Sequence, residues 1–244
     1  FYRKLIQRLS SSHRVVAPDH IGCGLSDKPQ DWGYRLEDHI QKLEQLVLEL
    51  DLRNITLVVH DWGGAIGCGF ATRHAQRIAR VFVMNTAAFP GGRIPRRIQV
   101  CRTPFVGEYA VRGLNAFARA AIDMAVESTE GMPAKVRRGF LAPYDSWAHR
   151  IAVFRFVMDI PLEPSHPSYA TLEAIDKQLQ RLASKPMRIA WGEKDWCFTP
   201  AFREMWEQRF PAAETMAIED AGHYLLEDAH ERVLPWLEEW LTRS

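Results

Sequence analysis

The stretch Asn54–Gly64 constrains the fold most, because a buried strand ends there at Asp61 and a helix begins. The residues from Ile55 to Val59 are β-branched or leucine, which is typical of a strand buried on both faces. Two glycines follow, and then a small, mostly apolar run over 65–74 that predicts a short helix packed closely on a sheet. A sharp strand-to-helix turn lifts its corner side chain above the sheet. Asp61 is therefore either a nucleophile or a residue that only caps the helix.

The usual pattern at such a nucleophile corner is Gly-x-Ser-x-Gly. Here the five positions are Val59, His60, Asp61, Trp62 and Gly63, so the nucleophile would be a carboxylate. Val59 is larger than the residue expected at the first position.

The composition fits an enzyme-sized α/β protein and excludes several other classes. The chain has 244 residues, 47% of them hydrophobic, which suits one α/β domain with an insertion or two small domains. Charge is nearly balanced, with 31 Lys+Arg against 30 Asp+Glu, so a nucleic-acid or membrane-surface role gains no support. No apolar stretch approaches the roughly 18–20 residues that a membrane span needs. Four cysteines follow no metal-ligand spacing and predict reduced thiols in a cytoplasmic protein; they are Cys23, Cys68, Cys101 and Cys197. We expect no metal or cofactor.

Strands and helices are expected to alternate through most of the chain. After a helix over 1–9, the predicted strands cover 14–19, 55–59, 79–85, 187–191 and 214–218. The predicted helices between and after them cover 36–50, 65–74, 169–183, 200–210 and a last segment ending near Leu241. This order implies right-handed crossovers and a mostly parallel sheet covered by helices on both faces.

The segment from Pro90 to about Pro167 differs, because it has no clear strand and carries helix-like pieces over 111–126 and 144–157. We predict an inserted helical cap over 90–167, with a core made of 1–89 and 168–244. Most of the aromatic side chains of this segment are expected to form the interior of the cap. A few are expected to face a pocket, since substrate sites are concave and mostly apolar.

Three polar residues follow the predicted strands, and they are Asp61, Asp195 and His223. Ligands of parallel sheets bind beyond these strand ends. Taken singly, Asp195 could cap the next helix and His223 could hold a turn. Their order, nucleophile then acid then histidine, is that of the α/β-hydrolase triad. An aspartate that attacks carbon forms an ester, His223 would activate water to remove it, and Asp195 would orient the imidazole.

Trp62 is a candidate binding residue. Its backbone N–H is expected to help stabilise an oxyanion. Its indole N–H could aim a donor at a leaving group, or the ring could merely fill space.

Three motifs give the chain a resemblance to the α/β-hydrolase superfamily, and within it to the haloalkane dehalogenases, over nearly its whole length. These are Pro18–Pro29, with Asp-His-Ile-Gly-Cys-Gly-Leu-Ser-Asp-Lys, then Val58–Gly64 and Ala221–Asp228. The resemblance implies Asp61 as nucleophile, His223 as base and Trp62 as one of two halide-stabilising donors. Some dehalogenases carry the acid after the preceding strand, where this chain has Asn85, so the acid falls to Asp195.

Epoxide hydrolases also carry His-Asp-Trp-Gly-Gly, and they use two cap tyrosines. Nothing in the sequence pairs any two of Tyr109, Tyr144 and Tyr169. The loop ending Gly-Leu-Ser-Asp-Lys-Pro favours the dehalogenases.

The cap resembles that of the β-lactone decarboxylases of bacterial long-chain olefin biosynthesis. The matching segments are Asn85–Pro90, Arg112–Ala118, Pro143–Arg150 and Ser168–Leu172. The implied reaction is loss of CO2 from a long-chain cis-β-lactone to leave a cis-alkene, with Asp61 attacking either a ring carbon or the carbonyl. Haloalkane dehalogenase is the second hypothesis and epoxide hydrolase the third. A protein of this fold that binds without catalysis is a fourth, disfavoured by the complete triad.

The implied partner is a small apolar substrate, and a homo-oligomer or a pathway complex is left open. The chain begins at Phe1 inside an expected helix, so N-terminal strands of the natural protein are expected to be absent. By the resemblance, a His-Gly segment with a second leaving-group donor would precede Phe1.

Overall fold

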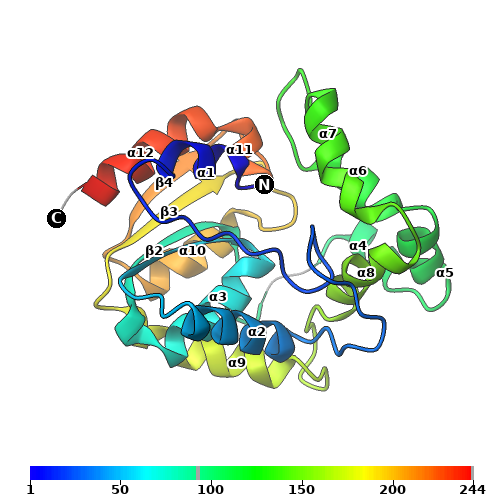
Figure 1. Ribbon diagram of the computed structural model, residues 1–244, viewed down its shortest axis with the longest axis horizontal. Coiled ribbons are helices and arrows are strands. Elements are labelled where there is room, and N and C mark those ends of the chain that lie inside the picture. Colours follow the sequence, from blue (N-terminus) through cyan, green and yellow to red (C-terminus); the bar gives the residue numbers. More distant parts are fainter. Residues whose placement is uncertain (92–93, 243–244) are drawn as a thin grey trace.

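Four parallel strands form the centre of the protein, which we describe from a computed structural model over residues 1–91 and 94–242. The strands lie in the order β1 (Ile55–Asp61), β2 (Ile78–Thr86), β3 (Met187–Gly192) and β4 (Glu214–Ile218). Every neighbouring pair is parallel. The C-terminal ends of all four strands therefore meet at one edge of the sheet (Figure 1).

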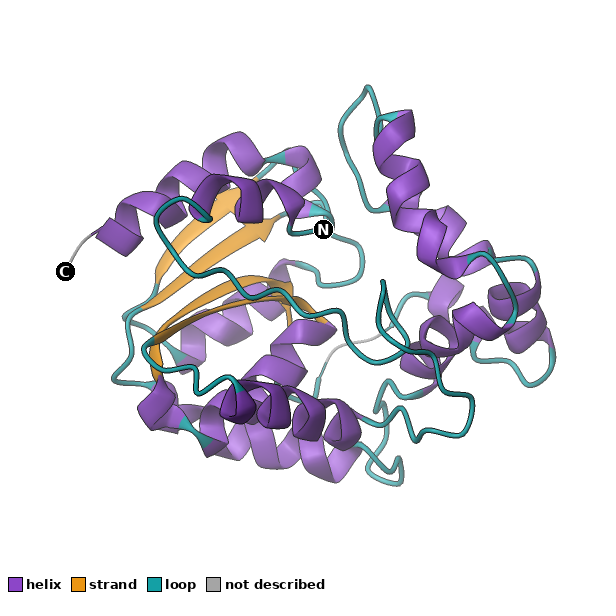
Figure 2. Ribbon diagram, viewed as in Figure 1, coloured by secondary structure: helices purple, strands orange, loops and turns teal. Residues whose placement is uncertain are grey.

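Helices cover both faces of this sheet, as the sequence predicts (Figures 1 and 2). One face packs against α2 (Leu36–Glu49), α3 (Trp62–Arg73), α9 (Tyr169–Gln178) and α10 (Pro200–Arg209). The other packs against α1 (Arg3–Leu9), α11 (Leu225–Asp228) and α12 (His230–Thr242). Both faces are apolar because successive side chains of a strand point to opposite faces of the sheet. Val81 and Val83 of β2 pack against the first group of helices, and Phe82 and Met84 pack against the second. The predicted fold class is confirmed.

The strand predicted over 14–19 is wrong. This segment has no regular structure, and Val16 within it is 40% exposed. A strand needs a hydrogen-bonded neighbour, and in the described part of the chain β1 stands at the edge of the sheet without one on that side. Pro18 also lacks the N–H that a ladder uses.

A group of helices stands to one side of the sheet beyond the strand ends (Figure 1). These are α4 (Arg96–Cys101), α5 (Val106–Glu108), α6 (Ala116–Met124), α7 (Ala134–Leu141) and α8 (Ile151–Met158). We propose residues 90–167 as a cap, and 1–89 with 168–244 as the core. Residues 92–93 and 243–244 lie outside the described part of both.

The helical pieces predicted inside the cap are shorter than expected. The helix predicted over 111–126 is split into a π-helical turn, Tyr109–Gly113, and α6. Asn115 between them has φ 54°, a left-handed conformation that interrupts a helix. The helix predicted over 144–157 begins only at Ile151, after two 3₁₀ turns. Among the described residues, no helix is both long and apolar enough to cross a bilayer.

We expect Phe82→Ala to lower the free energy of unfolding by about 3–5 kcal/mol, the cost typical of truncating a fully buried phenylalanine. Phe82 has no exposed surface, and the centre of its ring lies 5.7 Å from that of Trp236 and 6.2 Å from that of Trp240. Urea denaturation followed by circular dichroism measures the change. The matched control is Leu48→Ala, in α2 and 42% exposed, with an expected effect within about 0.5 kcal/mol. Equal losses in both variants would contradict this assignment of the core.

Candidate active site

Asp61 occupies the corner between β1 and α3 in a strained conformation. Its φ of 49° is unusual for a residue with a side chain and is typical of a position held for function. Its carboxylate makes no capping hydrogen bond to α3. The side chain is instead 43% exposed, and it lines a cavity. The capping alternative therefore has no support at this corner.

The large Val59 is accommodated by a glycine on the opposing helix. A Cβ atom at Gly67 of α3 would lie 2.7 Å from Cγ1 of Val59, so no larger residue fits there. A Cβ atom at Gly64 would overlap Thr86 of β2, whose hydroxyl donates to the Asp61 carbonyl. In the usual pattern, a small residue before the nucleophile lets the strand and the helix pack closely. Here Gly67 of the helix provides that space instead.

The structure brings Asp61, His223 and Asp195 together. His223 lies in the loop after β4, and Asp195 lies in the loop after β3. His223 Nδ1 is 2.8 Å from Asp195 Oδ2, and its Nε2 is 3.7 Å from Asp61 Oδ2. The imidazole therefore stands between two carboxylates, with one ring nitrogen toward each.

Asp195 is buried, and its Oδ1 is fully engaged by backbone N–H groups. It is 2% exposed, and its Oδ1 accepts the backbone N–H groups of Cys197 at 2.7 Å and Phe198 at 3.0 Å. The residue that caps α10 is Thr199, which precedes Pro200. The alternative in which Asp195 merely caps that helix does not hold, and its Oδ2 is left for the histidine.

Asn85 also contacts the acid, although the sequence interpretation gave it no role. Its Nδ2 donates to Asp195 Oδ2 at 3.0 Å, and its Oδ1 accepts the N–H of Gly192 at 2.9 Å. The signal was available, because Asn85 ends a buried strand at the same edge of the sheet as Asp61. It fixes the orientation of the carboxylate that faces His223.

His60 is a second residue that the sequence interpretation did not assign. Its Nε2 lies 2.8 Å from the backbone carbonyl of His223. Burial lowers the pKa of His60 to about 3, so the ring is neutral and donates one N–H to that carbonyl. A polar residue beside Asp61 in an otherwise apolar strand was the only available signal. His60 thus holds the backbone of His223, whereas Asp195 holds the ring of His223.

The charges of the site stabilise one another. Burial would lower the pKa of His223, but Asp195 and Asp61 outweigh it and raise the value to about 10. Burial would likewise raise the pKa of Asp61, but His223 and His60 outweigh it and lower the value. At neutral pH Asp61 is therefore an ionised carboxylate beside an imidazolium, and it needs no base to act as a nucleophile.

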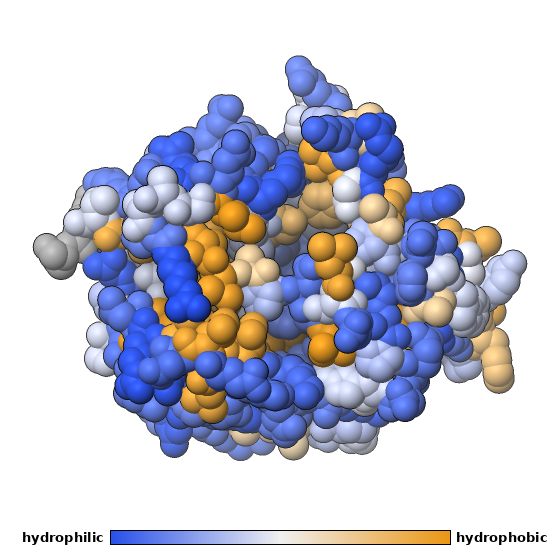
Figure 3. Space-filling model, in the orientation of Figure 1, coloured by the Kyte–Doolittle hydropathy of each residue, from blue (hydrophilic) through white to orange (hydrophobic). Residues whose placement is uncertain are grey.

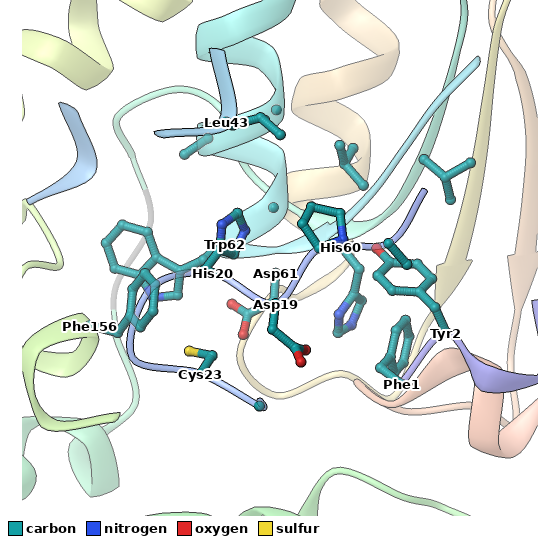
Figure 4. A pocket seen from close by; sticks show the side chains of 18 of the residues that line it. Phe1, Tyr2, Asp19, His20, Cys23, Leu43, His60, Asp61, Trp62 and Phe156 are labelled. Carbon is teal, nitrogen blue, oxygen red and sulfur yellow. The ribbon is translucent and has the colours of Figure 1, made fainter. Parts of the chain in front are cut away.

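A mostly apolar cavity with a total volume of about 1790 Å³ runs from the exposed side of β1 to the space in front of Asp61. The part in front of Asp61 appears as a hollow between the core and the cap helices (Figure 3). In Figure 4, Trp62 and Phe156 lie on one side of Asp61, and His60, Tyr2 and Phe1 lie on the other. Phe156 belongs to α8 of the cap, and its ring centre is 5.1 Å from that of Trp62. The cavity also continues along the edge of β1, where Ile55 and Leu57 line it.

Trp62 and the three candidate tyrosines differ in their access to this cavity. Trp62 lines it, and within residues 1–91 and 94–242 its indole N–H has no hydrogen-bond partner. Of the tyrosines, Tyr144 lines the cavity, Tyr109 is 61% exposed, and Tyr169 lies outside the lining. The cap therefore presents no pair of tyrosines to Asp61. In the described part of the chain, no group of three His, Cys, Asp or Glu side chains could hold a metal ion.

Comparisons with known proteins identify the family to which the fold belongs. A family model described as alpha/beta hydrolase fold matches residues 1–112. The cis-3-alkyl-4-alkyloxetan-2-one decarboxylase of Shewanella oneidensis is 41% identical over all of this chain and 78% of its own length. The chain belongs to the α/β-hydrolase superfamily, in its haloalkane dehalogenase-like group.

Two further members of this group are similar to the chain. Haloalkane dehalogenase 1 of Mycobacterium tuberculosis is 31% identical over 96% of this chain and 78% of its own. The crystal structure of a haloalkane dehalogenase from Agrobacterium tumefaciens has a TM-score of 0.81 at 24% identity and shows the same fold. The match covers 92% of this chain and 78% of that one. The resemblance predicted from the sequence motifs is confirmed.

We expect Asp61→Asn to lower the pKa of His223, because it removes one of the two carboxylates that raise it. Asp195→Asn is expected to lower it further, since Asp195 contributes more. NMR titration of histidine-labelled protein measures both values. The raised pKa also stabilises the fold: this contribution is complete below pH 6.5 and is lost as the pH rises through about 10. An unchanged pKa in Asp61→Asn would contradict the pairing.

Proposed function

We propose that the protein decarboxylates a long-chain cis-3-alkyl-4-alkyloxetan-2-one, a cis-β-lactone, to a cis-alkene and CO2. The observation that carries the proposal is the 41% identity, along the whole chain, to a decarboxylase of that substrate class. An ionised carboxylate at the floor of a large apolar cavity supports it.

In the first step, Asp61 attacks the ring carbon that bears the ring oxygen. A new C–O bond forms, the ring C–O bond breaks, and its electron pair leaves as the carboxylate of the opened lactone. The product is an alkyl ester of Asp61. Trp62, whose indole N–H has no hydrogen-bond partner among the described residues, lies on the cavity wall and donates to the released carboxylate.

In the second step, the bond to the carboxylate breaks and CO2 leaves. Its electron pair forms the C=C bond and expels Asp61, which returns as a free carboxylate. No oxidant, reductant or water is consumed. Attack opposite the ring oxygen places the new ester bond anti to the carboxylate. Anti elimination then leaves both alkyl groups on the same side, which gives the cis-alkene.

His223 and Asp195 take supporting roles in this reaction. Protonated His223, 3.7 Å from Asp61, stabilises the negative charge that returns to Asp61 during elimination. Asp195, held by Asn85 and two backbone N–H groups, orients the imidazole through Nδ1.

The cavity has room for two alkyl groups on adjacent ring carbons. Two contacts between cap and core flank the triad. Phe156 meets Trp62 at 5.1 Å, and Phe140 of α7 meets Tyr224 beside His223 at 5.3 Å. We assign one alkyl chain to each of these two apolar walls.

Haloalkane hydrolysis is the second candidate, favoured by the 31% identity to a dehalogenase and by the indole N–H of Trp62, which no other described residue accepts. Asp61 would then displace halide. His223, which loses its proton more easily once Asp61 is an uncharged ester, would activate the water that cleaves it. Epoxide hydrolysis lacks the paired cap tyrosines.

We place the reaction in the cytoplasm, which the free cysteines Cys23, Cys68, Cys101 and Cys197 support. The proposed binding partner is the small apolar substrate.

A homo-oligomer is left open, and sedimentation velocity measures whether the protein forms one.

The decisive experiment offers the protein a long-chain cis-β-lactone or a 1-bromoalkane in water enriched in ¹⁸O. With the lactone we expect alkene and CO2, and no ¹⁸O in the Asp61 peptide by mass spectrometry, because elimination breaks the alkyl C–O bond. Hydrolysis of an alkyl ester would instead place ¹⁸O on Asp61. Halide release without alkene would exclude the first proposal in favour of the second.

Asp61→Asn is expected to lower turnover by at least about 10³-fold, because it removes the nucleophile. Steady-state assays with either substrate measure the loss. The control is Asp31→Asn, an exposed residue that does not line the cavity, with unchanged turnover expected. Full activity in Asp61→Asn would refute Asp61 as the nucleophile.

A further inference from the structure

The loop that carries His223 is hydrogen-bonded to the cap. The N–H of Tyr224, the residue after His223, donates to the carbonyl of Ala125 at 2.7 Å. Ala125 directly follows α6 of the cap. The loop of the acid is fastened to the same place, because Trp196 Nε1 donates to the carbonyl of Met124 at 2.7 Å. The end of α6 thus contacts both loops that bring His223 and Asp195 to Asp61.

A single carboxylate, that of Asp228, joins the cap to the residue before His223. Its Oδ2 accepts the N–H of Gly222 at 2.8 Å. The same carboxylate accepts the N–H groups of Glu127 at 3.0 Å and Ser128 at 3.1 Å. Hydrogen bonds to an ionised acceptor are stronger than neutral ones. Asp228 ends α11 and lies on the core side, so these bonds cross from core to cap.

The packing around Gly222 leaves no room for a side chain there. A Cβ atom at Gly222 would lie 3.0 Å from Cγ of Glu127 and 3.2 Å from the carbonyl of Ala125. On its other side, Gly192 of β3 packs so closely that a Cβ atom there would overlap the Gly222 carbonyl. Gly222 is therefore held between the cap and the loop of the acid, and a shift of the cap at this point moves the backbone of His223.

From this geometry we propose that Asp228 is a positioning residue that couples the cap to His223. We call the carboxylate and its three N–H donors, on Gly222, Glu127 and Ser128, the cap–base latch. The proposal rests on the proposed function, in which His223 must stand beside Asp61.

The latch also connects the substrate pocket to His223. Phe117, Ala121 and Ile122 of α6 line the cavity, and the latch begins three residues after that helix ends. A substrate chain packed against α6 holds the helix in place, and the latch passes that constraint to His223. Substrate binding and alignment of His223 are therefore linked.

The test is Asp228→Asn, studied by hydrogen–deuterium exchange without substrate and by steady-state kinetics with the lactone. The neutral amide weakens all three hydrogen bonds, so we expect amides of 221–224 and of 125–128 to exchange faster together. We expect kcat to fall by about 10- to 100-fold. KM should rise by a smaller factor than that by which kcat falls, because the cavity walls are unaltered and only the coupling between α6 and His223 is weakened.

Two further variants separate coupling from loss of stability. Asp220→Asn removes an equal charge from the loop that carries His223, at an exposed residue paired with Arg232, and should leave exchange and kcat unchanged. Ser128→Pro removes one donor from the cap side and leaves Asp228 in place, so it should reproduce a smaller share of both effects. It also keeps the test available if Asp228→Asn fails to fold.

The outcomes distinguish this proposal from the proposed function. Faster exchange confined to 221–224, or a lower melting temperature with unchanged kcat, overturns the latch. If the wild type releases no CO2 from the lactone, the proposed function fails. The coupled exchange of the two segments, measured without substrate, then still decides the latch.

Discussion

The arrangement of the site depends on one electrostatic interaction, the imidazole of His223 held between the carboxylates of Asp195 and Asp61. Two anions raise the pKa of the histidine, and the resulting cation lowers the pKa of Asp61. His223 is largely buried, whereas the Asp61 side chain is 43% exposed toward the cavity. The proposed nucleophile and the imidazolium therefore stabilise one another, and the surrounding structure holds both in place.

Three parts of the structure hold these residues in place. The parallel sheet brings the ends of β1, β3 and β4 to one edge. Asn85 and two backbone N–H groups fix Asp195, and His60 fixes the carbonyl of His223. The third part is the cap, which is joined to the loop of His223 by hydrogen bonds to the carboxylate of Asp228. The proposed cap, which lines the cavity, is thus also hydrogen-bonded to the loop of His223.

In the reactions that we propose, decarboxylation and hydrolysis diverge at the ester of Asp61. Where the substrate carries a carboxylate beside the esterified carbon, departure of CO2 would expel Asp61 as a free carboxylate. Where it carries none, water would have to cleave the ester, and His223 would first have to lose its proton. The same arrangement of side chains is therefore compatible with either reaction.

The fold class and the strand-to-helix corner at Asp61 were predictable from the amino-acid sequence, because strand periodicity and turn residues are local signals. The prediction that Asp61, Asp195 and His223 lie together followed from their positions after strands of a parallel sheet. Prediction from the sequence failed at Arg14–Asp19, which needs a neighbouring strand, and inside the cap, where Asn115 breaks a helix whose apolar pattern continues. The space that Gly67 leaves for Val59, and the hydrogen bonds of Asn85, His60 and Asp228 to the loops of Asp195 and His223, became visible in the three-dimensional packing. These contacts join residues far apart in the chain, and no local pattern encodes their distances.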